Sequence, residues 1–134
     1  MRIGMVVAEY NRDITSKMEA AAEKEIKKLG HKLVGKFHVA GVLDVPVGAD
    51  YLLKHRDVDG IVVLGAILQG ETHHDIVVAD VASGGIVQLM VKYGKPIGWG
   101  ISGPRQNKAQ AAKRAELYAR DAVKAAVKTF EQMK

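Results

Sequence analysis

The sequence predicts an α/β protein: a single-domain, three-layer α/β/α sandwich around a four-stranded parallel sheet. Two observations carry this prediction. Apolar runs and segments with helical periodicity alternate four times along the 134 residues, and strand–helix–strand units of this kind place helices on both faces of a parallel sheet. The length suits one compact domain, residues 1–134, and no repeat or linker divides the chain.

The first half of the chain is expected to hold two strands and two helices. Residues 2–9 form a continuous apolar run typical of a buried strand, and residues 31–40 alternate more, as expected nearer a sheet edge. Between them, Asp13 or Thr15 is expected to cap a helix that ends at Gly30. Its apolar stripe comprises Met18, Ala21, Ala22, Ile26 and Leu29. A short second helix carries Tyr51, Leu52 and Leu53.

The second half is expected to hold two more strands and two more helices. Residues 59–68 are rich in Val, Ile and Leu, which predicts a buried strand, and residues 95–101 form the fourth strand. A helix is expected from about His74 to Tyr93, with Gly94 at its end. The last helix is long and rich in alanine. It is expected to turn one face inward, made of Ala111, Ala115, Tyr118, Ala122, Ala125 and Thr129.

Composition narrows the class of protein. Apolar residues make up 48% of the chain and charged residues 26%, as in ordinary globular proteins. No run approaches the roughly 20 consecutive apolar residues of a membrane helix, and the N-terminus lacks a secretory cleavage site, so no membrane partner is expected. The absence of cysteine excludes disulfide scaffolds, thiol catalysis and thiolate metal sites. It also fits a cytoplasmic location.

The net charge of +5 is concentrated in residues 105–134, which hold eight Lys or Arg and three Asp or Glu. Such an excess attracts phosphorylated ligands or nucleic acid, or it simply makes a solvated face, which is the commoner case. No basic motif interleaved with aromatic residues is present, so no nucleic-acid partner is expected.

Functional residues are expected in the segments that follow the four strands. In open parallel sheets, ligands bind beyond the carboxyl ends of the strands, where the strand order switches. The segments concerned are residues 9–12, 39–44, 66–74 and 99–105. In these segments the sequence also departs from the apolar pattern typical of a buried core.

Two motifs in these segments are misleading. The glycines of GWGISG (Gly98, Gly100 and Gly103) match a dinucleotide-binding fingerprint, but no strand follows the last helix to complete the required unit. Close packing of a glycine-rich strand end is the better interpretation. In HHD, at residues 73–75, adjacent side chains at a helix start point about 100° apart, which suits metal chelation poorly. No metal site is predicted.

His74 is a candidate proton-transfer residue because its ordinary pKa lies near neutrality and it sits in a polar turn after a strand. The alternative is that one histidine of the pair caps the turn and the other is exposed. The expected N-terminus of the next helix follows Gly70, Glu71 and Thr72, and free backbone N–H groups at such a position can bind phosphate. The Glu71 side chain must then point away from the phosphate. Arg114 can supply a bidentate partner for the same phosphate, or it is a solvated residue.

Aromatic residues are scarce, at 5% of the chain, yet Tyr10 and Trp99 are expected to end the first and fourth strands. Together they suggest a surface on which a flat heterocycle stacks, although each can equally be core or rim. Asp44, in the loop after the second strand, either accepts hydrogen bonds from substrate hydroxyls or caps the next helix. The residues leave these alternatives open.

Three segments carry a family resemblance: VVAEYNRDIT at residues 6–15, VAGVLDVP at residues 39–46 and GAILQGETHHD at residues 65–75. Their order and spacing resemble those of lumazine synthases, whose motifs include an aromatic–Asn pair, a VPG loop and GxxIxGxTxH. The motif GETxHD is similar to that of the archaeal branch of the family. The likeness covers essentially the whole chain and implies a flavodoxin-like fold.

The resemblance implies a cytoplasmic transferase that condenses 5-amino-6-ribitylaminouracil with 3,4-dihydroxy-2-butanone 4-phosphate, without metal or organic cofactor. His74 would transfer protons, and the neighbouring subunit of a pentamer or 60-subunit shell would contribute two residues to each site. Matched by position, the substrate-binding residues are Tyr10, Asn11, Val42, Leu43, Asp44, Ile67, Leu68, Gly70, Glu71 and Thr72, with Trp99 and Arg114 from the neighbour.

The sequence departs from the family at three positions. Ala40 replaces the proline of the VPG loop, and Gln69 stands where many members have arginine. The lysine of the last helix near the phosphate has no clean counterpart and falls on Arg120 or Asp121. Two alternatives stay open: an archaeal-type riboflavin synthase on the same fold, and a non-catalytic flavin- or nucleotide-binding protein.

Overall fold

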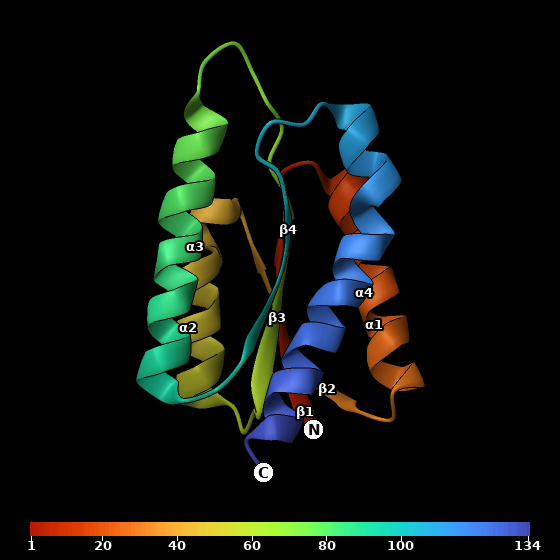
Figure 1. Ribbon diagram of the computed structural model, residues 1–134, viewed down its shortest axis with the longest axis vertical. Helices are drawn as coiled ribbons and strands as arrows, with labels where there is room; N and C mark the ends of the chain where they lie inside the picture. The colour runs from red at the N-terminus through yellow and green to blue at the C-terminus, as the bar shows by residue number, and fades with distance from the viewer.

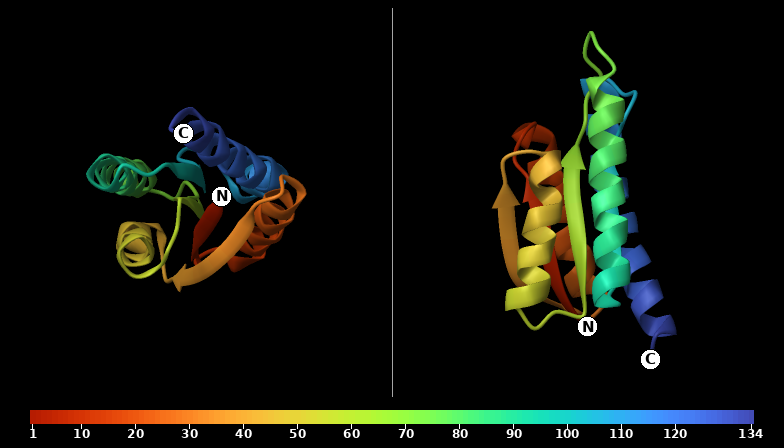
Figure 2. Two further views of the ribbon diagram at one scale, coloured as in Figure 1. Left: turned by 90° about the horizontal axis from the view of Figure 1, so that it is seen from below. Right: turned by 90° about the vertical axis from the view of Figure 1, so that its left-hand side faces the viewer.

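The four predicted strands form one parallel sheet with helices on both faces (Figures 1 and 2). The computed structural model describes all 134 residues. The strands are β1 (Arg2–Ala8), β2 (Lys32–Val39), β3 (Gly60–Ala66) and β4 (Ile97–Ser102), in the order β2-β1-β3-β4. One face carries α1 (Arg12–Lys28) and α4 (Lys108–Gln132); the other carries α2 (Val45–His55) and α3 (His74–Tyr93), and a 3-10 turn covers Val42–Asp44. The predicted fold class is confirmed.

The burial of β1, β2 and β3 agrees with their sequence patterns. Every residue of β3 is buried, and β1 is buried from Ile3 onward, because helices cover both faces of these central strands. In the edge strand β2 only Val39 is buried, whereas five of the six residues of β4, at the other edge, are buried because α4 lies close against this strand. The strand order switches between β1 and β3, which places a ligand-binding crevice at their carboxyl ends.

The start of α1 differs from the prediction. Asn11 occupies the N-cap position, in a left-handed conformation with φ of 63°, and Asp13 and Thr15 lie inside the helix. Asparagine tolerates this conformation better than most residues, which explains the earlier start. The stripe residue Leu29 lies beyond the helix and is 39% exposed, because the chain turns at Gly30 with a φ of +81°.

Helix α4 lies against β4 so closely that only glycine fits beneath it. A Cβ at Gly98 would overlap the backbone of Ala122, and a Cβ at Gly100 would meet the Ala122 side chain at 3.0 Å. The close packing inferred for the GWGISG segment is therefore confirmed. The buried stripe of α4 is Ala111, Ala115, Ala119, Ala122, Val123 and Ala126.

Two residues predicted for this inner face, Ala125 and Thr129, are exposed, and Tyr118 is only half-buried. The predicted stripe contains Tyr118 and the observed stripe contains Ala119, and both stripes fit helical spacing. Packing against α1 decides between them, because the buried residues of α4 share one core cluster with Ile14, Met18, Ala22 and Ile26 of that helix.

Helix α3 leaves much of its own apolar surface exposed. Only Asp75, Ala79, Ala82 and Ile86 are buried. Four valines, here called the valine stripe, are between 52% and 80% exposed along one side: Val77, Val81, Val87 and Val91. By length and composition alone, α3 is apolar enough to cross a membrane. No consecutive apolar run marks this helix in the sequence, because polar residues interrupt its apolar ones.

Candidate active site

A cavity of about 590 Å³ opens at the carboxyl ends of the central strands. Three segments surround it, each directly after a strand, as expected from the switch in strand order. The lining residues are Tyr10, Asn11, Gly41, Val42, Leu43, Asp44, Ala66, Ile67, Leu68, Gln69, Gly70, Thr72, His74, Asp75 and Val78.

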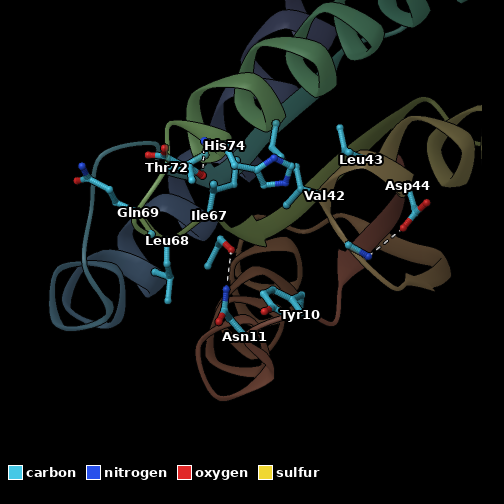
Figure 3. A pocket seen from close by; sticks show the side chains of 15 residues that line it. Tyr10, Asn11, Val42, Leu43, Asp44, Ile67, Leu68, Gln69, Thr72 and His74 are labelled. Carbon is cyan, nitrogen blue, oxygen red and sulfur yellow. Dashed lines mark hydrogen bonds between the residues drawn. The ribbon is translucent and has the colours of Figure 1, made fainter.

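The turn after β1 supplies Tyr10 and Asn11 (Figure 3). The backbone N–H of Tyr10 donates to the Ala40 carbonyl at 3.0 Å, and the side chain of Tyr10 is 75% exposed. The Asn11 side-chain amide donates to the Ala66 carbonyl at the end of β3, also at 3.0 Å. An exposed aromatic ring is thereby held beside the mouth of the cavity on a fixed backbone.

A charged cluster fixes the helix that follows this turn. Arg12 pairs with Glu19 at 2.7 Å, while Lys36 and His38 of β2 approach the same carboxylate at 2.8 and 3.1 Å. Burial raises the pKa of Glu19, but hydrogen bonds from Lys36, His38 and Arg12 outweigh it and lower the pKa to about 2. The cluster ties the start of α1 to the edge strand.

The segment after β2 forms the second wall. The Asp44 carboxylate accepts a hydrogen bond from the Gly41 backbone N–H at 3.0 Å and makes no side-chain cap for α2. Asp44 therefore stands at the N-cap position of α2, but its side chain does not cap that helix. Its carboxylate instead closes the preceding turn through Gly41. Val42 is buried, whereas Leu43 is 51% exposed at the mouth of the cavity.

The segment after β3 forms the third wall and enters α3. Ile67 is buried and Leu68 half-buried, and the loop then becomes exposed. The His74 backbone N–H donates to the Thr72 hydroxyl at 3.3 Å, while the His74 imidazole points into the cavity (Figure 3). His73 stands at the N-cap position without a side-chain cap hydrogen bond, so neither histidine caps the helix.

The cavity holds two carboxylates, Asp44 and Asp75, and the imidazole of His74, but no Lys or Arg. A phosphorylated ligand would therefore meet backbone N–H groups and an imidazole in this chain without a permanently cationic side chain. No group of three or more His, Asp or Glu side chains is arranged to hold a metal ion.

Ten of the thirteen predicted site residues line this cavity, and three do not. Glu71 is exposed and absent from the lining, as expected for a side chain that points away. Trp99 lies within β4 rather than at its end, and lines a separate hollow of about 260 Å³ with Tyr118 and Asp121. Within one chain, Tyr10 and Trp99 therefore do not form a common stacking surface.

Arg114 is an exposed residue of α4, on the opposite face of the sheet from α3. Of the two residues matched to the family's lysine, Arg120 lies 3.6 Å from Glu116 on the same helix, and Asp121 lines the smaller hollow. Neither lines the large cavity. All the candidate residues from β4 and α4 thus lie outside the cavity of their own chain.

Five lining residues were not predicted as site residues: Gly41, Ala66, Gln69, Asp75 and Val78. Three of them, Gly41, Ala66 and Gln69, lie in the segments expected to hold functional residues. Their position directly after a strand could have identified them as lining residues. Asp75 belongs to the HHD motif and was considered only as a metal ligand. Val78 follows His74 by one helical turn, a spacing that places both on one side of α3.

Known proteins resemble this chain over its whole length. Residues 1–134 match the family model described as 6,7-dimethyl-8-ribityllumazine synthase. A protein of that name from Methanopyrus kandleri is 44% identical over all of this chain and 94% of its own length. Proteins of the same name from Staphylothermus marinus and Methanocaldococcus jannaschii are 44% and 42% identical over 99% and 100% of this chain, and 89% and 94% of their own.

These matches confirm the resemblance drawn from residues 6–15, 39–46 and 65–75. They favour neither the riboflavin synthase alternative nor the non-catalytic one, since the matching family and relatives all carry the lumazine synthase name. The chain belongs to the 6,7-dimethyl-8-ribityllumazine synthase family.

Proposed function

We propose that this protein condenses 5-amino-6-(D-ribitylamino)uracil with 3,4-dihydroxy-2-butanone 4-phosphate in riboflavin biosynthesis. The products are 6,7-dimethyl-8-ribityllumazine, phosphate and water. The observation that carries this proposal is the cavity itself. It gathers ten residues that the family resemblance assigns to the two substrates, from three segments far apart in the sequence.

The uracil is assigned to the side of the cavity formed by the first two segments. The exposed ring of Tyr10 offers an aromatic face for stacking, and Asn11 holds the adjacent backbone through its bond to Ala66. The backbone of Val42 and Leu43 and the second carboxylate oxygen of Asp44 would meet the ribityl chain, because only one Asp44 oxygen is engaged by Gly41.

The phosphorylated substrate is assigned to the turn before α3. Backbone N–H groups of Gly70, Glu71 and Thr72, at the positive end of a 20-residue helix, suit a phosphate. The condensation moves protons between nitrogen, carbon and oxygen as water and phosphate leave. His74, whose imidazole faces the cavity, is the group proposed to transfer these protons.

A second copy of the chain is proposed to complete each site. The cavity holds no Lys or Arg to neutralise a phosphate, while Trp99 and Arg114 lie outside the cavity of their own chain. The valine stripe of α3 is apolar surface that an adjacent subunit would cover. We therefore propose a cytoplasmic ring of identical subunits, a pentamer or a 60-subunit shell of pentamers, in which each subunit lends Trp99 and Arg114 to its neighbour.

The proposed reaction is tested by incubating the purified assembly with the two precursors, and separately with lumazine alone. We expect lumazine and one equivalent of phosphate from the precursors, measured by chromatography and a phosphate assay, and no reaction of lumazine. Formation of riboflavin from lumazine alone would instead identify a riboflavin synthase. Tight binding of flavin without turnover of either mixture would identify a carrier.

A further inference from the structure

The turn assigned to phosphate is held at both ends by one other loop. Residues 70–74 form this turn, which projects beyond the sheet beside the loop of residues 103–107 between β4 and α4 (Figures 1 and 2). Just before the turn, the Gln69 backbone N–H donates to the Gln106 carbonyl at 2.9 Å. Just after it, the Asp75 carboxylate accepts a hydrogen bond from the Arg105 backbone N–H, also at 2.9 Å.

The two attachments differ in kind. The one at Gln69 is part of a buried network, in which the Gln106 side chain donates to the Ile67 carbonyl at 3.1 Å and to the Ser102 hydroxyl at 2.9 Å. The one at Asp75 depends on a single carboxylate oxygen. Asp75 is only 4% exposed, and it belongs to the first turn of α3 directly after His74.

The loop residue that Asp75 holds has an unusual conformation. Arg105 has a φ of +61°, a left-handed conformation that a residue with a large side chain rarely adopts. Such a conformation persists only where the surroundings fix it, and strained residues of this kind cluster at functional sites. Here the buried Asp75 carboxylate on one side and the Gln106 network on the other supply that fixation.

We propose that Asp75 is a positioning residue for the phosphorylated substrate: its carboxylate pins the α3 end of the 70–74 turn to Arg105. This inference rests on the proposed function and adds a residue to it. With Gln69 and Asp75 both tied to adjacent residues of one loop, the span of the turn is fixed, and so are its phosphate-facing N–H groups and the start of the helix that carries His74. Without the Asp75 bond, the turn keeps only its Gln69 attachment.

The test compares Asp75→Ala with Asp75→Asn in the assembled enzyme. Asp75→Ala removes the acceptor, and we expect the KM for the butanone phosphate to rise roughly tenfold or more, since misplacement by a fraction of an ångström is costly. The KM for the uracil should change by less than about twofold, because its proposed contacts lie on other segments. Asp75→Asn keeps an oxygen acceptor and should stay within roughly threefold of wild type.

Two control variants separate the backbone link from other effects. Asp57→Ala removes an exposed acidic residue from the loop before β3, at the other end of the sheet from the cavity, and should leave both KM values unchanged. Arg105→Gly keeps the backbone N–H and suits the positive φ, so it should also be near wild type. If Asp75→Ala does not assemble, Asp75→Ser, whose hydroxyl is too short to reach the Arg105 N–H, replaces it with the same expectation.

Calorimetric titration with inorganic phosphate makes the test independent of turnover. Asp75→Ala should weaken phosphate binding in parallel with the KM, even if the proposed reaction proved wrong. Three outcomes would overturn the inference. These are equal changes in both KM values, an Asp75→Asn variant as weak as Asp75→Ala, and an Arg105→Gly variant with the same loss.

Discussion

The two faces of the sheet differ in how much apolar surface their helices leave exposed. On the α1 and α4 face, α4 buries six residues and lies directly on the glycines of β4. On the other face, the 20-residue α3 buries four residues, a similar fraction, but it exposes the four valines of the valine stripe, whereas α4 exposes only Leu117 among its large apolar residues. We call the side with α1 and α4 the finished face, because its helices leave little apolar surface exposed. We call the side with α2 and α3 the unfinished face, because the valine stripe is the kind of exposed apolar surface expected where another protein chain packs.

The candidate site follows the same division. Its cavity lies at the end of the unfinished face, where α3 begins with His74, and it is lined by residues from the loops after β1, β2 and β3. The remaining candidates, Trp99 and Arg114, belong to β4 and α4, which contribute nothing to that cavity. The comparison therefore predicts that the finished face controls folding of the subunit, and the unfinished face controls assembly and catalysis.

The largest expected effect is on the finished face. Gly98→Val places side-chain atoms where the Ala122 backbone lies, and neither backbone can move without breaking the sheet or α4. We expect a loss of about 3 kcal/mol or more in the free energy of unfolding, or no folded protein at all. Urea denaturation followed by circular dichroism measures it.

The matched change on the other face is Gly84→Ala in α3, where an added Cβ meets no atom within 4 Å. Alanine is the better helix former, so the unfolding free energy of the subunit should be unchanged or higher by up to about 1 kcal/mol. A comparable loss from both glycine changes would show that the two faces are equally closed.

A charge in the valine stripe should prevent assembly. Val81 is 59% exposed, and Val81→Asp would place a carboxylate in the proposed subunit contact without disturbing the core. We expect light scattering to report monomers with a native circular dichroism spectrum, and activity to fall at least about a hundredfold because each site loses its neighbour's residues. Leu29→Asp, a charge at an exposed leucine after α1, is the control and should assemble normally.

Mixed assemblies test whether the two faces meet in one site. His74→Ala should slow catalysis by roughly tens- to a thousandfold, and Trp99→Ala should also be inactive. When the two variants are refolded together in equal amounts, roughly a quarter of the subunit contacts pair an intact His74 with an intact Trp99. About a quarter of wild-type activity should therefore return. No recovery in rings shown by mass spectrometry to be mixed would place the whole site within one chain.

The smallest expected effect concerns the cluster at the edge of the finished face. Glu19 has a pKa of about 2 in the folded protein against an ordinary value of 4.5, so its stabilising contribution is complete above about pH 4.5 and is lost as the pH falls toward 2. Glu19→Gln should cost about 1–2 kcal/mol at neutral pH. Urea unfolding from pH 7 to pH 2 should show this difference shrinking as the pH falls.

Glu23→Gln is the control for this measurement. Glu23 is more exposed and contacts only Lys36, at 2.6 Å, so its loss should cost less than about 0.5 kcal/mol at any pH. A Glu19→Gln difference that stays constant down to pH 2 would assign the role of Glu19 to packing rather than to charge.

Much of the site followed from the sequence because position along the chain and position in the fold are linked. Four segments were expected to hold functional residues because each follows a parallel strand. The cavity is lined by residues from three of them, 9–12, 39–44 and 66–74, and by none from residues 99–105. Asp75 was missed because its partner, the Arg105 backbone, is distant in sequence. A carboxylate that holds a backbone N–H leaves no pattern of residue types to recognise.

The sequence by itself determined the number of strands, the parallel sheet and the edge of the sheet where the cavity opens, because apolar periodicity and strand–helix alternation are local properties. Only the tertiary structure decided which stripe of α4 faces inward, since two stripes satisfy helical spacing and packing against α1 selects one. It also decided that Tyr10 and Trp99 line different hollows and that the valine stripe stays uncovered. Distances between segments remote in sequence set these features, and periodicity does not encode them.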